Sequence, residues 1–387
     1  MTKKIAIVGI GETKIGHVPN KNSLQLYGEA SKNAIEDAGL NKADIDGVLT
    51  AGSYIDNYLM HSAVFCEYFQ LKPKYSATVL LGGVGPCHMV MEAAAAINAG
   101  LCETVLIVAE DTLLSKGREK AVELMAGFSN PQFELPYGFI TPSMYALAAT
   151  RHMFQYGTTQ EQLAQVAVSM RKHASLNPNA HFQKSITIDD VLNSKDISWP
   201  LHLLDCSPVS DGGAALIVTT EERAKDLRKT PIYILGTGEG HELDHNNPKR
   251  DITFSAALTA GKTAFGAAGL APKDMDFAQI YDCFTITLLV LLEDLGFCEK
   301  GEGGSFIGDG SRIEIGGEIP VNTNGGLLSQ GHPGPPAGMF HITEAVKQLR
   351  WEAEADRHVA NANVGLVYGN GGMLRIGAAL ILGRDRN

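Results

Sequence analysis

The sequence predicts an α/β fold made of two duplicated halves. Residues 34–46 and 264–276 share six identities in thirteen positions at a constant offset of 230. Both copies end a helical pattern with Ala-Gly-Leu and lead through a short acidic loop into an apolar run. Elsewhere, apolar runs of strand length alternate with helical patterns. Two similar α/β halves predict a pseudo-twofold molecule, whose ligand sites form at strand C-terminal ends and helix N-termini.

The length of the chain predicts how the two halves are divided. A chain of 387 residues is too long for one simple core. We assign residues 1–225 to the first half and residues 226–387 to the second, with an inserted, mostly helical segment at about 112–200. This segment either covers a site or stabilises the fold as a flap, and the sequence leaves both interpretations open.

The composition excludes several classes of function. The formal net charge of −11 argues against nucleic acid as the main partner. The six cysteines form no CxxC pair, so we expect neither a zinc ribbon nor a redox motif. We expect no metal site, and the scattered cysteines fit a reducing cytoplasm. Met1 leads almost directly into an apolar strand, without a secretory signal. The most apolar run, residues 284–292, is too short to span a membrane.

The first half follows the strand–helix alternation closely. Its alanine-rich helix at 86–99 is flanked by glycines, which is typical of tight packing in a crowded centre. The predicted elements are a strand at 5–11, a helix at 23–38 that ends at Gly39, a strand at 47–50, a helix at 60–69, a strand at 77–81, a Gly-rich turn at 82–85, a helix at 86–99 and a strand at 103–108.

Three motifs in the second half fall where a ligand site is expected. Tyr281-Asp-Cys-Phe follows a predicted strand at 277–280, and Tyr368-Gly-Asn-Gly-Gly follows another at 364–367. His332 lies between a glycine and a proline that restricts the backbone, and a helical pattern begins after Pro336. This places His332 at or near a helix N-terminus, which suits negative charge. An incidental histidine in a Gly/Pro-rich turn would give the same pattern.

These stretches together resemble the thiolase superfamily, in particular the sterol carrier protein X-type thiolases. The resemblance extends to Ala6-Ile-Val-Gly-Ile-Gly-Glu-Thr and to Leu204-Asp-Cys-Ser-Pro-Val-Ser-Asp-Gly-Gly-Ala, and covers essentially the whole chain. It implies the five-layered αβαβα thiolase fold, an obligate homodimer and a substrate carried as a coenzyme A thioester. No covalently bound cofactor is implied. The glycines expected to lie against the thioester are Gly83, Gly331, Gly371 and Gly372.

The departures from this family change the expected chemistry. The nucleophilic cysteine of the thiolases is replaced by Gly83, which cannot form an acyl-enzyme. Their second, proton-shuttling cysteine is replaced by Tyr368, and the Asn or His of their HDCF-type motif by Tyr281, while His332 of the GHP motif is retained. This set is similar to the steroid side-chain-cleaving aldolases, which act on β-hydroxyacyl-CoA together with a small zinc-ribbon and OB-fold subunit.

The resemblance therefore implies a retro-aldol reaction, which needs no nucleophile. We assign Tyr281 to the β-hydroxyl group, Tyr368 to the α-carbon, and His332 to the oxygen of the thioester enolate. Either tyrosine would, if structural, simply pack at a strand end. Two other functions remain open, namely a thiolase that uses Cys87 or direct attack by coenzyme A, and a non-catalytic CoA- or lipid-binding subunit.

Overall fold

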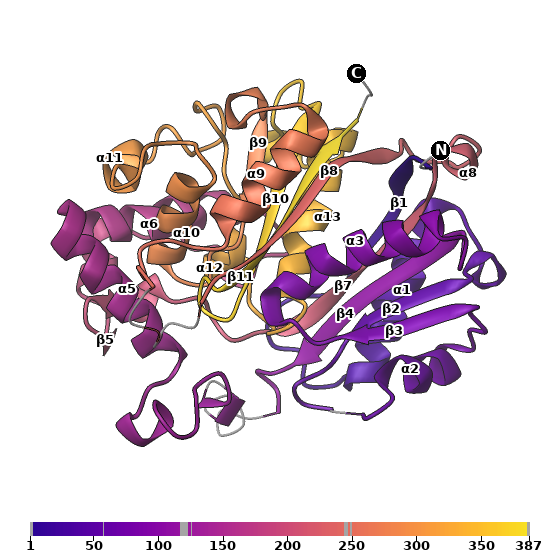
Figure 1. Ribbon diagram of the computed structural model, residues 1–387, viewed down its shortest axis with the longest axis horizontal. Helices are drawn as coiled ribbons and strands as arrows, with labels where there is room; N and C mark the ends of the chain where they lie inside the picture. Colours follow the sequence, from indigo (N-terminus) through magenta and orange to yellow (C-terminus); the bar gives the residue numbers. More distant parts are fainter. Residues whose placement is uncertain are drawn as a thin grey trace.

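The computed structural model describes residues 3–56, 58–116, 123–124, 126–243, 247 and 250–384. Two halves of similar build lie side by side, with β1 to β4 of the first half in indigo to purple and α9 to β11 of the second in orange to yellow (Figure 1). The first half contains β1 (Ile5–Glu12), α1 (Ser23–Ala38), β2 (Gly47–Ala51), α2 (His61–Phe69), β3 (Tyr75–Val79), α3 (Gly85–Asn98), β4 (Thr104–Thr112), β7 (Asp211–Thr220) and α8 (Glu221–Ala224).

The second half repeats this order of elements except that, among the described residues, no strand takes the place of β3. It contains β8 (Ile232–His241), α9 (Ala257–Ala268), β9 (Phe277–Ile280), α10 (Thr285–Asp294), α11 (Gly303–Ile307), α12 (Gly326–Ser329), α13 (Ala337–Arg350), β10 (Val364–Gly371) and β11 (Ile376–Gly383). Between β4 and β7 the chain forms α5 (Thr141–Tyr156), α6 (Gln160–Ser175), α7 (Ile188–Leu192), β5 (Asp196–Ser198) and β6 (Leu201–His202).

The two half-sheets have matching topologies, apart from β3 at the outer edge of the first, which has no counterpart among the described strands of the second. The strand order is β3-β2-β4-β7-β1-β8-β11-β10-β9, so the halves join where β1 pairs antiparallel with β8 at Ala6 and Ile7. In the first half β2 is parallel to β4, and β7 is antiparallel to β4 and β1. In the second half β9 is parallel to β10, and β11 is antiparallel to β10 and β8. The internal repeat of the sequence therefore reappears as a repeat of strand pairing.

Five layers follow from where the cores lie. Helices α3 and α13 pack together between the two half-sheets, and their buried side chains, such as Met89 and Phe340, share one core with both sheets. A second core lies under α1 and α2, and a third under α9 and α10. The expected αβαβα order is therefore confirmed.

The repeated segment is alike in detail. Gly39 and Gly269 both end their helices in the left-handed conformation, with φ of 71° and 69°, which favours glycine. In each copy the aspartate before the next strand accepts backbone N–H bonds that start a neighbouring strand, Asp46 from Thr104 and Asp276 from Val364. The offset of 230 thus reflects two equivalent helix–loop–strand units.

One predicted strand boundary is wrong in a way that affects the site. The sequence predicts a strand that ends at Val367, before the glycine motif. Instead β10 continues to Gly371, because β11 pairs with it along its whole length, from Val364 opposite Gly383 to Gly371 opposite Ile376. The predicted strand at 77–81 also lies slightly earlier, at Tyr75–Val79.

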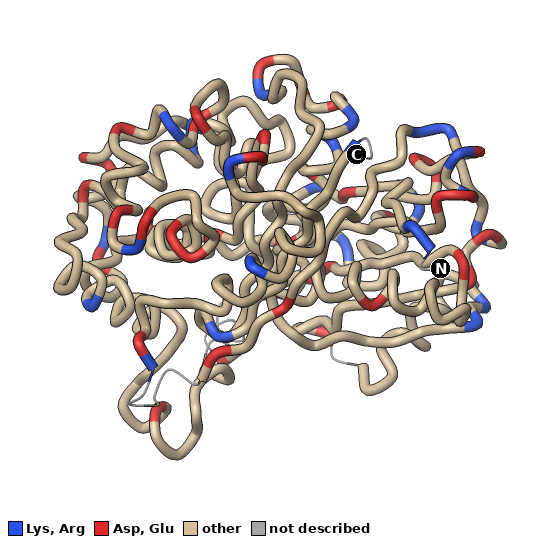
Figure 2. The backbone as a smooth tube through the Cα atoms, turned by 45° about the horizontal axis from the view of Figure 1, so that its top comes forward, with Lys and Arg blue, Asp and Glu red and all other residues tan. Residues whose placement is uncertain are grey.

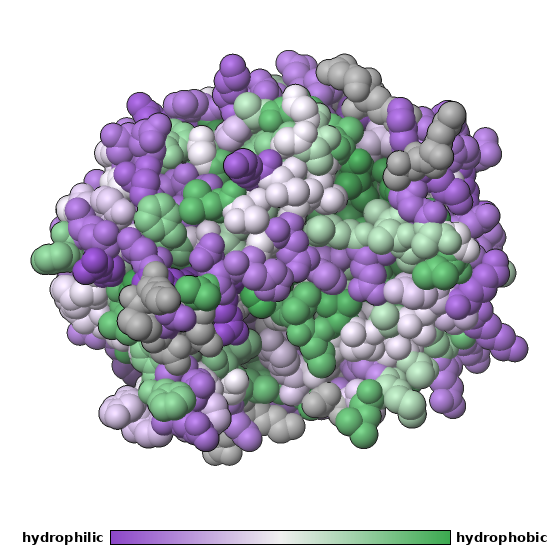
Figure 3. All heavy atoms as spheres, in the orientation of Figure 1, coloured by the Kyte–Doolittle hydropathy of each residue, from purple (hydrophilic) through white to green (hydrophobic). Residues whose placement is uncertain are grey.

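The surface is of mixed character. Lys and Arg positions alternate with Asp and Glu around the outer loops (Figure 2). On the face in Figure 3, patches of apolar side chains lie near the middle of the molecule, and polar side chains separate them. Among the described residues, no helix combines the length and apolar character needed to cross a bilayer, and no group of three or more His, Cys, Asp or Glu side chains could hold a metal ion.

Candidate active site

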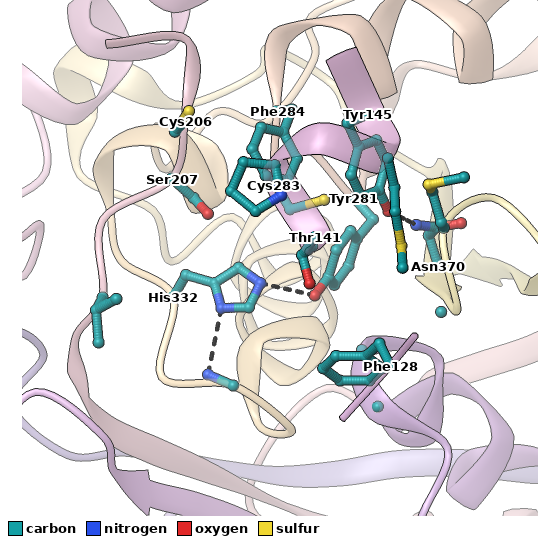
Figure 4. Close-up of a pocket in the computed structure, with 18 of the residues that line it drawn as sticks. Phe128, Thr141, Tyr145, Cys206, Ser207, Tyr281, Cys283, Phe284, His332 and Asn370 are labelled. Carbon is teal, nitrogen blue, oxygen red and sulfur yellow. Dashed lines mark hydrogen bonds between the residues drawn. The ribbon is translucent and has the colours of Figure 1, made fainter. Parts of the chain in front are cut away.

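A cavity of about 290 Å³ lies where the second half-sheet meets the inserted segment. Its walls are mostly apolar, and the polar side chains that line it include Tyr281 and His332 (Figure 4). Glycines from both halves contribute parts of the wall that consist of backbone alone. Those glycines are Gly82, Gly83, Gly334, Gly371 and Gly372, and the apolar side chains from the inserted segment include Leu124, Phe128, Pro142, Met144 and Ile197.

Tyr281 and His332 meet in this cavity. The Tyr281 hydroxyl lies 2.8 Å from Nε2 of His332. Tyr281 follows β9, and its backbone N–H donates to the carbonyl of Tyr368 on β10. The backbone N–H of His332 donates to the hydroxyl of Ser210 at 3.2 Å, and its carbonyl accepts from the N–H of Ser210. Segments far apart in the sequence thus fix both rings.

The hydrogen bonds of His332 define its tautomer. The backbone N–H of Gly334 donates to Nδ1 at 3.2 Å, so Nδ1 is an acceptor and carries no proton. Burial lowers the pKa of His332 to about 4, so the ring is neutral at physiological pH and its one proton is on Nε2. Nε2–H therefore donates to the oxygen of Tyr281, and the O–H of Tyr281 is left to donate elsewhere.

The surroundings of His332 bear on its predicted role. Helix α13 begins at Ala337, so His332 lies in the loop that leads into this helix, near its N-terminus. Both ring nitrogens are also engaged, one with Gly334 and the other with Tyr281. The predicted donation from His332 to an enolate oxygen would require one of these bonds to break.

Gly83 and Tyr281 occupy complementary space. A Cβ atom built on Gly83 would lie well inside 3.0 Å of the Cε2, Cζ and hydroxyl atoms of Tyr281. The phenol ring therefore fills the volume that a side chain at position 83 would need. Gly83 follows β3 in the short turn Gly82–Val84, just before α3. The missing side chain and the tyrosine are thus two parts of one arrangement.

We expect Gly83→Ala to reduce activity while the chain still folds. The added methyl group must displace the Tyr281 ring, and overpacking of this kind costs about 1–3 kcal/mol of stability. A displacement near 1 Å at a reacting group can lower the rate about 10²-fold. The matched control is Gly266→Ala, because a Cβ atom there meets nothing within 4 Å. Equal turnover of the Gly83→Ala variant and the wild type would contradict this arrangement.

Tyr368 lies outside the cavity, which corrects its predicted role. Its side chain is completely buried in the core beneath α10, and it does not line the cavity. Its hydroxyl packs where a Cβ of Gly377 would be, and no described residue offers it a hydrogen bond. The sequence misled us because a strand, and not a turn, carries this residue. Gly331 also lies outside, against Ile15 and Ser210.

Of the three asparagines Asn322, Asn324 and Asn370, the first two lie outside the cavity and the third lines it. Asn322 holds the end of β9, because its side chain accepts from the N–H of Ile280 and donates to the carbonyl of the same residue. Asn324 accepts from the N–H of Gly326. Neither lines the cavity. Asn370 does line it and donates to the hydroxyl of Tyr145 at 3.0 Å (Figure 4).

The acidic and sulfur-containing residues near the site have structural environments. Asp282 accepts from the backbone N–H of Leu327 at 2.7 Å and so holds the start of α12. Cys87 is fully buried, does not line the cavity, and has its pKa raised to about 12 by burial. A buried, protonated thiol is a poor nucleophile, and this argues against the alternative of a thiolase that uses Cys87.

The sequence missed two tyrosines that line the cavity. Tyr54 follows β2, and Tyr145 lies on α5 in the inserted segment. Neither belongs to a motif, and only contacts across the fold bring them to the site. The inserted segment lines the site, as Phe128 and Thr141 also demonstrate (Figure 4). The interpretation of the segment as a cover for a site is therefore favoured over that of a simple flap.

Comparisons with known proteins agree with this architecture. Residues 5–222 match the family described as thiolase, N-terminal domain, and residues 238–384 match the family described as thiolase C-terminal domain-like. The chain is 38% identical to a steroid side-chain-cleaving aldolase of Thermomonospora curvata over 394 residues, covering 98% of each chain. It is 36% identical to an acetyl-CoA acetyltransferase of Methanothermobacter thermautotrophicus, covering 96% of this chain and 97% of the relative.

A solved structure gives the same result in three dimensions. The Ltp2-ChsH2(DUF35) aldolase superposes with a TM-score of 0.87 at 35% identity, covering 99% of this chain and 98% of that one. Relatives of similar identity thus carry two different activities in their names, so the site must decide between them. Because the two thiolase domain matches together span most of its length, this chain is a member of the thiolase family.

Proposed function

We propose that this protein is a carbon–carbon lyase that cleaves β-hydroxyacyl-CoA thioesters by a retro-aldol reaction. The observation that carries the proposal is the Tyr281 ring, which occupies the side-chain space at Gly83 and is hydrogen-bonded to His332. A thiolase reaction of the covalent kind needs a nucleophile in that space. An aldol cleavage needs an acid or base there, and a phenol supplies one.

Tyr281 takes the proton of the β-hydroxyl group in this mechanism. The ionised phenol accepts the proton as the bond between the α- and β-carbons breaks, which leaves a carbonyl product and the enolate of an acyl-CoA. Burial raises the pKa of Tyr281 well above its ordinary value and opposes ionisation. The Nε2–H of His332 donates to the same oxygen and favours the ionised form. We therefore assign His332 to the support of Tyr281.

The lining of the cavity supports an apolar acyl group. Apolar side chains such as Phe128, Met144 and Phe284 form its walls, and the glycines Gly371 and Gly372 allow a close approach of backbone to ligand. The aldolase relative of Thermomonospora curvata acts, by its name, on steroid side chains. A bulky acyl chain such as a steroid side chain, carried as a coenzyme A thioester, is therefore the proposed substrate.

Product analysis with paired substrates tests this function. A β-hydroxyacyl-CoA and the matching β-ketoacyl-CoA are each incubated with the protein and with free coenzyme A, which a thiolase would consume, and the products are identified by mass spectrometry. We expect the hydroxy ester alone to be cleaved, to a shorter acyl-CoA and a ketone or aldehyde. Cleavage of the keto ester alone would support an acyltransferase. Cleavage of neither, in the presence of its partner subunit, would support a binding subunit.

The cleavage rate is expected to rise with pH. His332 has a pKa of about 4 and is neutral above that value. Its titration therefore does not change the slope of the pH–rate profile between about pH 5 and 9. The pKa of Tyr281 is raised by burial, so its ionised fraction increases about tenfold per pH unit below that pKa. We expect log kcat/KM to rise across about pH 6–9. A bell-shaped pH–rate profile with an apparent pKa near 6.5 would contradict this.

We also propose a homodimer core with a small zinc-ribbon and OB-fold subunit attached. Strand β3 is at one edge of the described sheet, and edge strands offer unpaired backbone groups to a partner chain. Near it, Leu59, Met60 and Leu80 are 103%, 71% and 65% exposed. The name of the Ltp2-ChsH2(DUF35) aldolase supports the second subunit. A fully active monomer, measured by light scattering during turnover, would contradict this assembly.

A further inference from the structure

We propose that Tyr54 is the second catalytic residue of this site and that its hydroxyl delivers a proton to the α-carbon after the carbon–carbon bond breaks. This assignment rests on the proposed retro-aldol function and completes it. The reaction needs an acid for the enolate as well as a base for the β-hydroxyl group. Tyr368, the residue that sequence motifs suggested, is buried away from the cavity.

The ring of Tyr54 is firmly held at the cavity wall. Its backbone N–H donates to a carboxylate oxygen of Asp111 at 2.6 Å, and the other oxygen of Asp111 accepts from Ser53 at 3.0 Å. Phe128 packs edge-on against the ring at 6.2 Å between centroids. A Cβ atom on Gly334 would lie 3.2 Å from Cδ2 of Tyr54, so this glycine lets the ring approach the loop after His332.

The hydroxyls of Tyr54 and Tyr281 both lie beside the turn Gly82–Val84. A Cβ atom on Gly82 would lie 3.6 Å from the Tyr54 hydroxyl, and one on the next residue, Gly83, would overlap the Tyr281 hydroxyl. Both residues line the cavity. The two phenols therefore stand beside consecutive glycines, where a thiolase would hold its acyl group.

The hydroxyl of Tyr54 is available to a ligand. Within the described ranges, no residue forms a hydrogen bond with it. The other two tyrosines that line the cavity both have hydrogen-bond partners, since Tyr145 accepts from Asn370 and Tyr281 is bonded to His332. The Tyr368 hydroxyl is fully buried and has no partner among the residues that the structure describes, whereas the Tyr54 hydroxyl is not fully buried. A hydroxyl that is unpaired and reachable inside a cavity can donate to a substrate atom.

The environments of the two phenols separate their roles. Burial, and then the nearby Asp111 carboxylate, raise the pKa of Tyr54, so this residue keeps its proton. A charge on Tyr54 also raises the pKa of Tyr281, so only one of the two ionises readily at a time. Only Tyr281 has a histidine N–H that favours its ionised form. Pairs with such different environments are typical of an acid and a base in one site.

The proton balance then closes within the pair. Ionised Tyr281 takes the β-hydroxyl proton, the electron pair of the O–H bond forms the new carbonyl, and the broken carbon–carbon bond leaves its electrons in the enolate. The α-carbon of the enolate takes the proton of Tyr54, which forms the acyl-CoA product and an ionised Tyr54. Transfer of the proton from Tyr281 to Tyr54 restores the starting state.

Deuterium exchange separates this proposal from the cleavage reaction. Propionyl-CoA alone is incubated in heavy water with the complete protein and its partner subunit, and α-deuterium is measured by mass spectrometry. We expect Tyr54→Phe to slow both exchange and cleavage about 10²-fold with KM changed much less. Tyr281→Phe should block cleavage and keep exchange. The control is Tyr368→Phe, which removes a hydroxyl outside the cavity and should keep both.

Each outcome decides one of the two claims. Exchange at the wild-type rate in Tyr54→Phe, exchange lost in Tyr368→Phe, or no exchange by the wild type would overturn the role of Tyr54. Tyr54-dependent exchange by a wild type that cleaves no β-hydroxyacyl-CoA would uphold the role of Tyr54 as the acid and overturn the retro-aldol function. Thermal unfolding of each variant verifies that the lost hydroxyl has not altered the fold.

Discussion

Tyr281→Phe is expected to lower the rate of carbon–carbon cleavage by about 10³-fold, within the range typical for loss of a general acid or base. The change removes one hydroxyl and leaves the ring that fills the space beside Gly83, so the cavity and the fold should persist. Because that hydroxyl acts on the β-oxygen as the bond breaks, kcat should fall far more than KM changes. Steady-state cleavage kinetics measure both quantities.

The control for this variant is Tyr137→Phe. Tyr137 lies in the inserted segment, is 86% exposed and does not line the cavity, so its hydroxyl should not matter. Near-normal cleavage by Tyr281→Phe would mean that Tyr281 is a packing residue, and the proposed mechanism would fail.

His332→Ala is expected to lower cleavage by about 10²-fold, as loss of one preorganised donor commonly does. The variant removes the N–H that stabilises charge on the Tyr281 oxygen. Burial then opposes ionisation of Tyr281 without compensation, so its pKa should rise further and the rising limb of the pH profile should move to higher pH. Cleavage rates across the pH range measure this displacement.

An asparagine at this position gives a more specific test. His332→Asn keeps a side-chain N–H of shorter reach, so we expect partial recovery relative to His332→Ala. His17→Ala, at an exposed position outside the cavity, is the control. If His332→Ala lowered the rate with an unchanged pH profile, the support of Tyr281 by His332 would be contradicted.

Much of the fold could be predicted because its signals are local or repeated. The offset of 230 joined two segments that indeed form equivalent helix ends, with Gly39 and Gly269 in the same conformation. Motif order placed Tyr281 and His332 in one cavity, although 51 positions separate them. The residue type at position 83 also predicts free space there, because glycine has no side chain. Its occupant, Tyr281, follows only from the three-dimensional packing.

The remaining features depend on contacts that the sequence does not encode locally. The glycines after Tyr368 resemble a turn, and only pairing with β11 makes them a strand that directs this tyrosine into the core. Tyr54 lies in a loop without periodicity or motif, and Asp111 on another strand fixes its place. Tyr145 comes from the inserted segment, whose path across the cavity is set by packing against the second half.

The central claim is that cleavage proceeds without a nucleophile and without thiolysis, and it is tested most directly by turnover in the absence of free coenzyme A. A β-hydroxyacyl-CoA is supplied to the protein and its partner subunit, free thiol is removed beforehand, and products and intact protein are followed by mass spectrometry. We expect many turnovers, one carbonyl product for each shorter acyl-CoA, no acyl adduct on Cys87, and the same behaviour in Cys87→Ala. Cleavage that stops until coenzyme A is added, or an acyl group on Cys87 during turnover, would contradict the account.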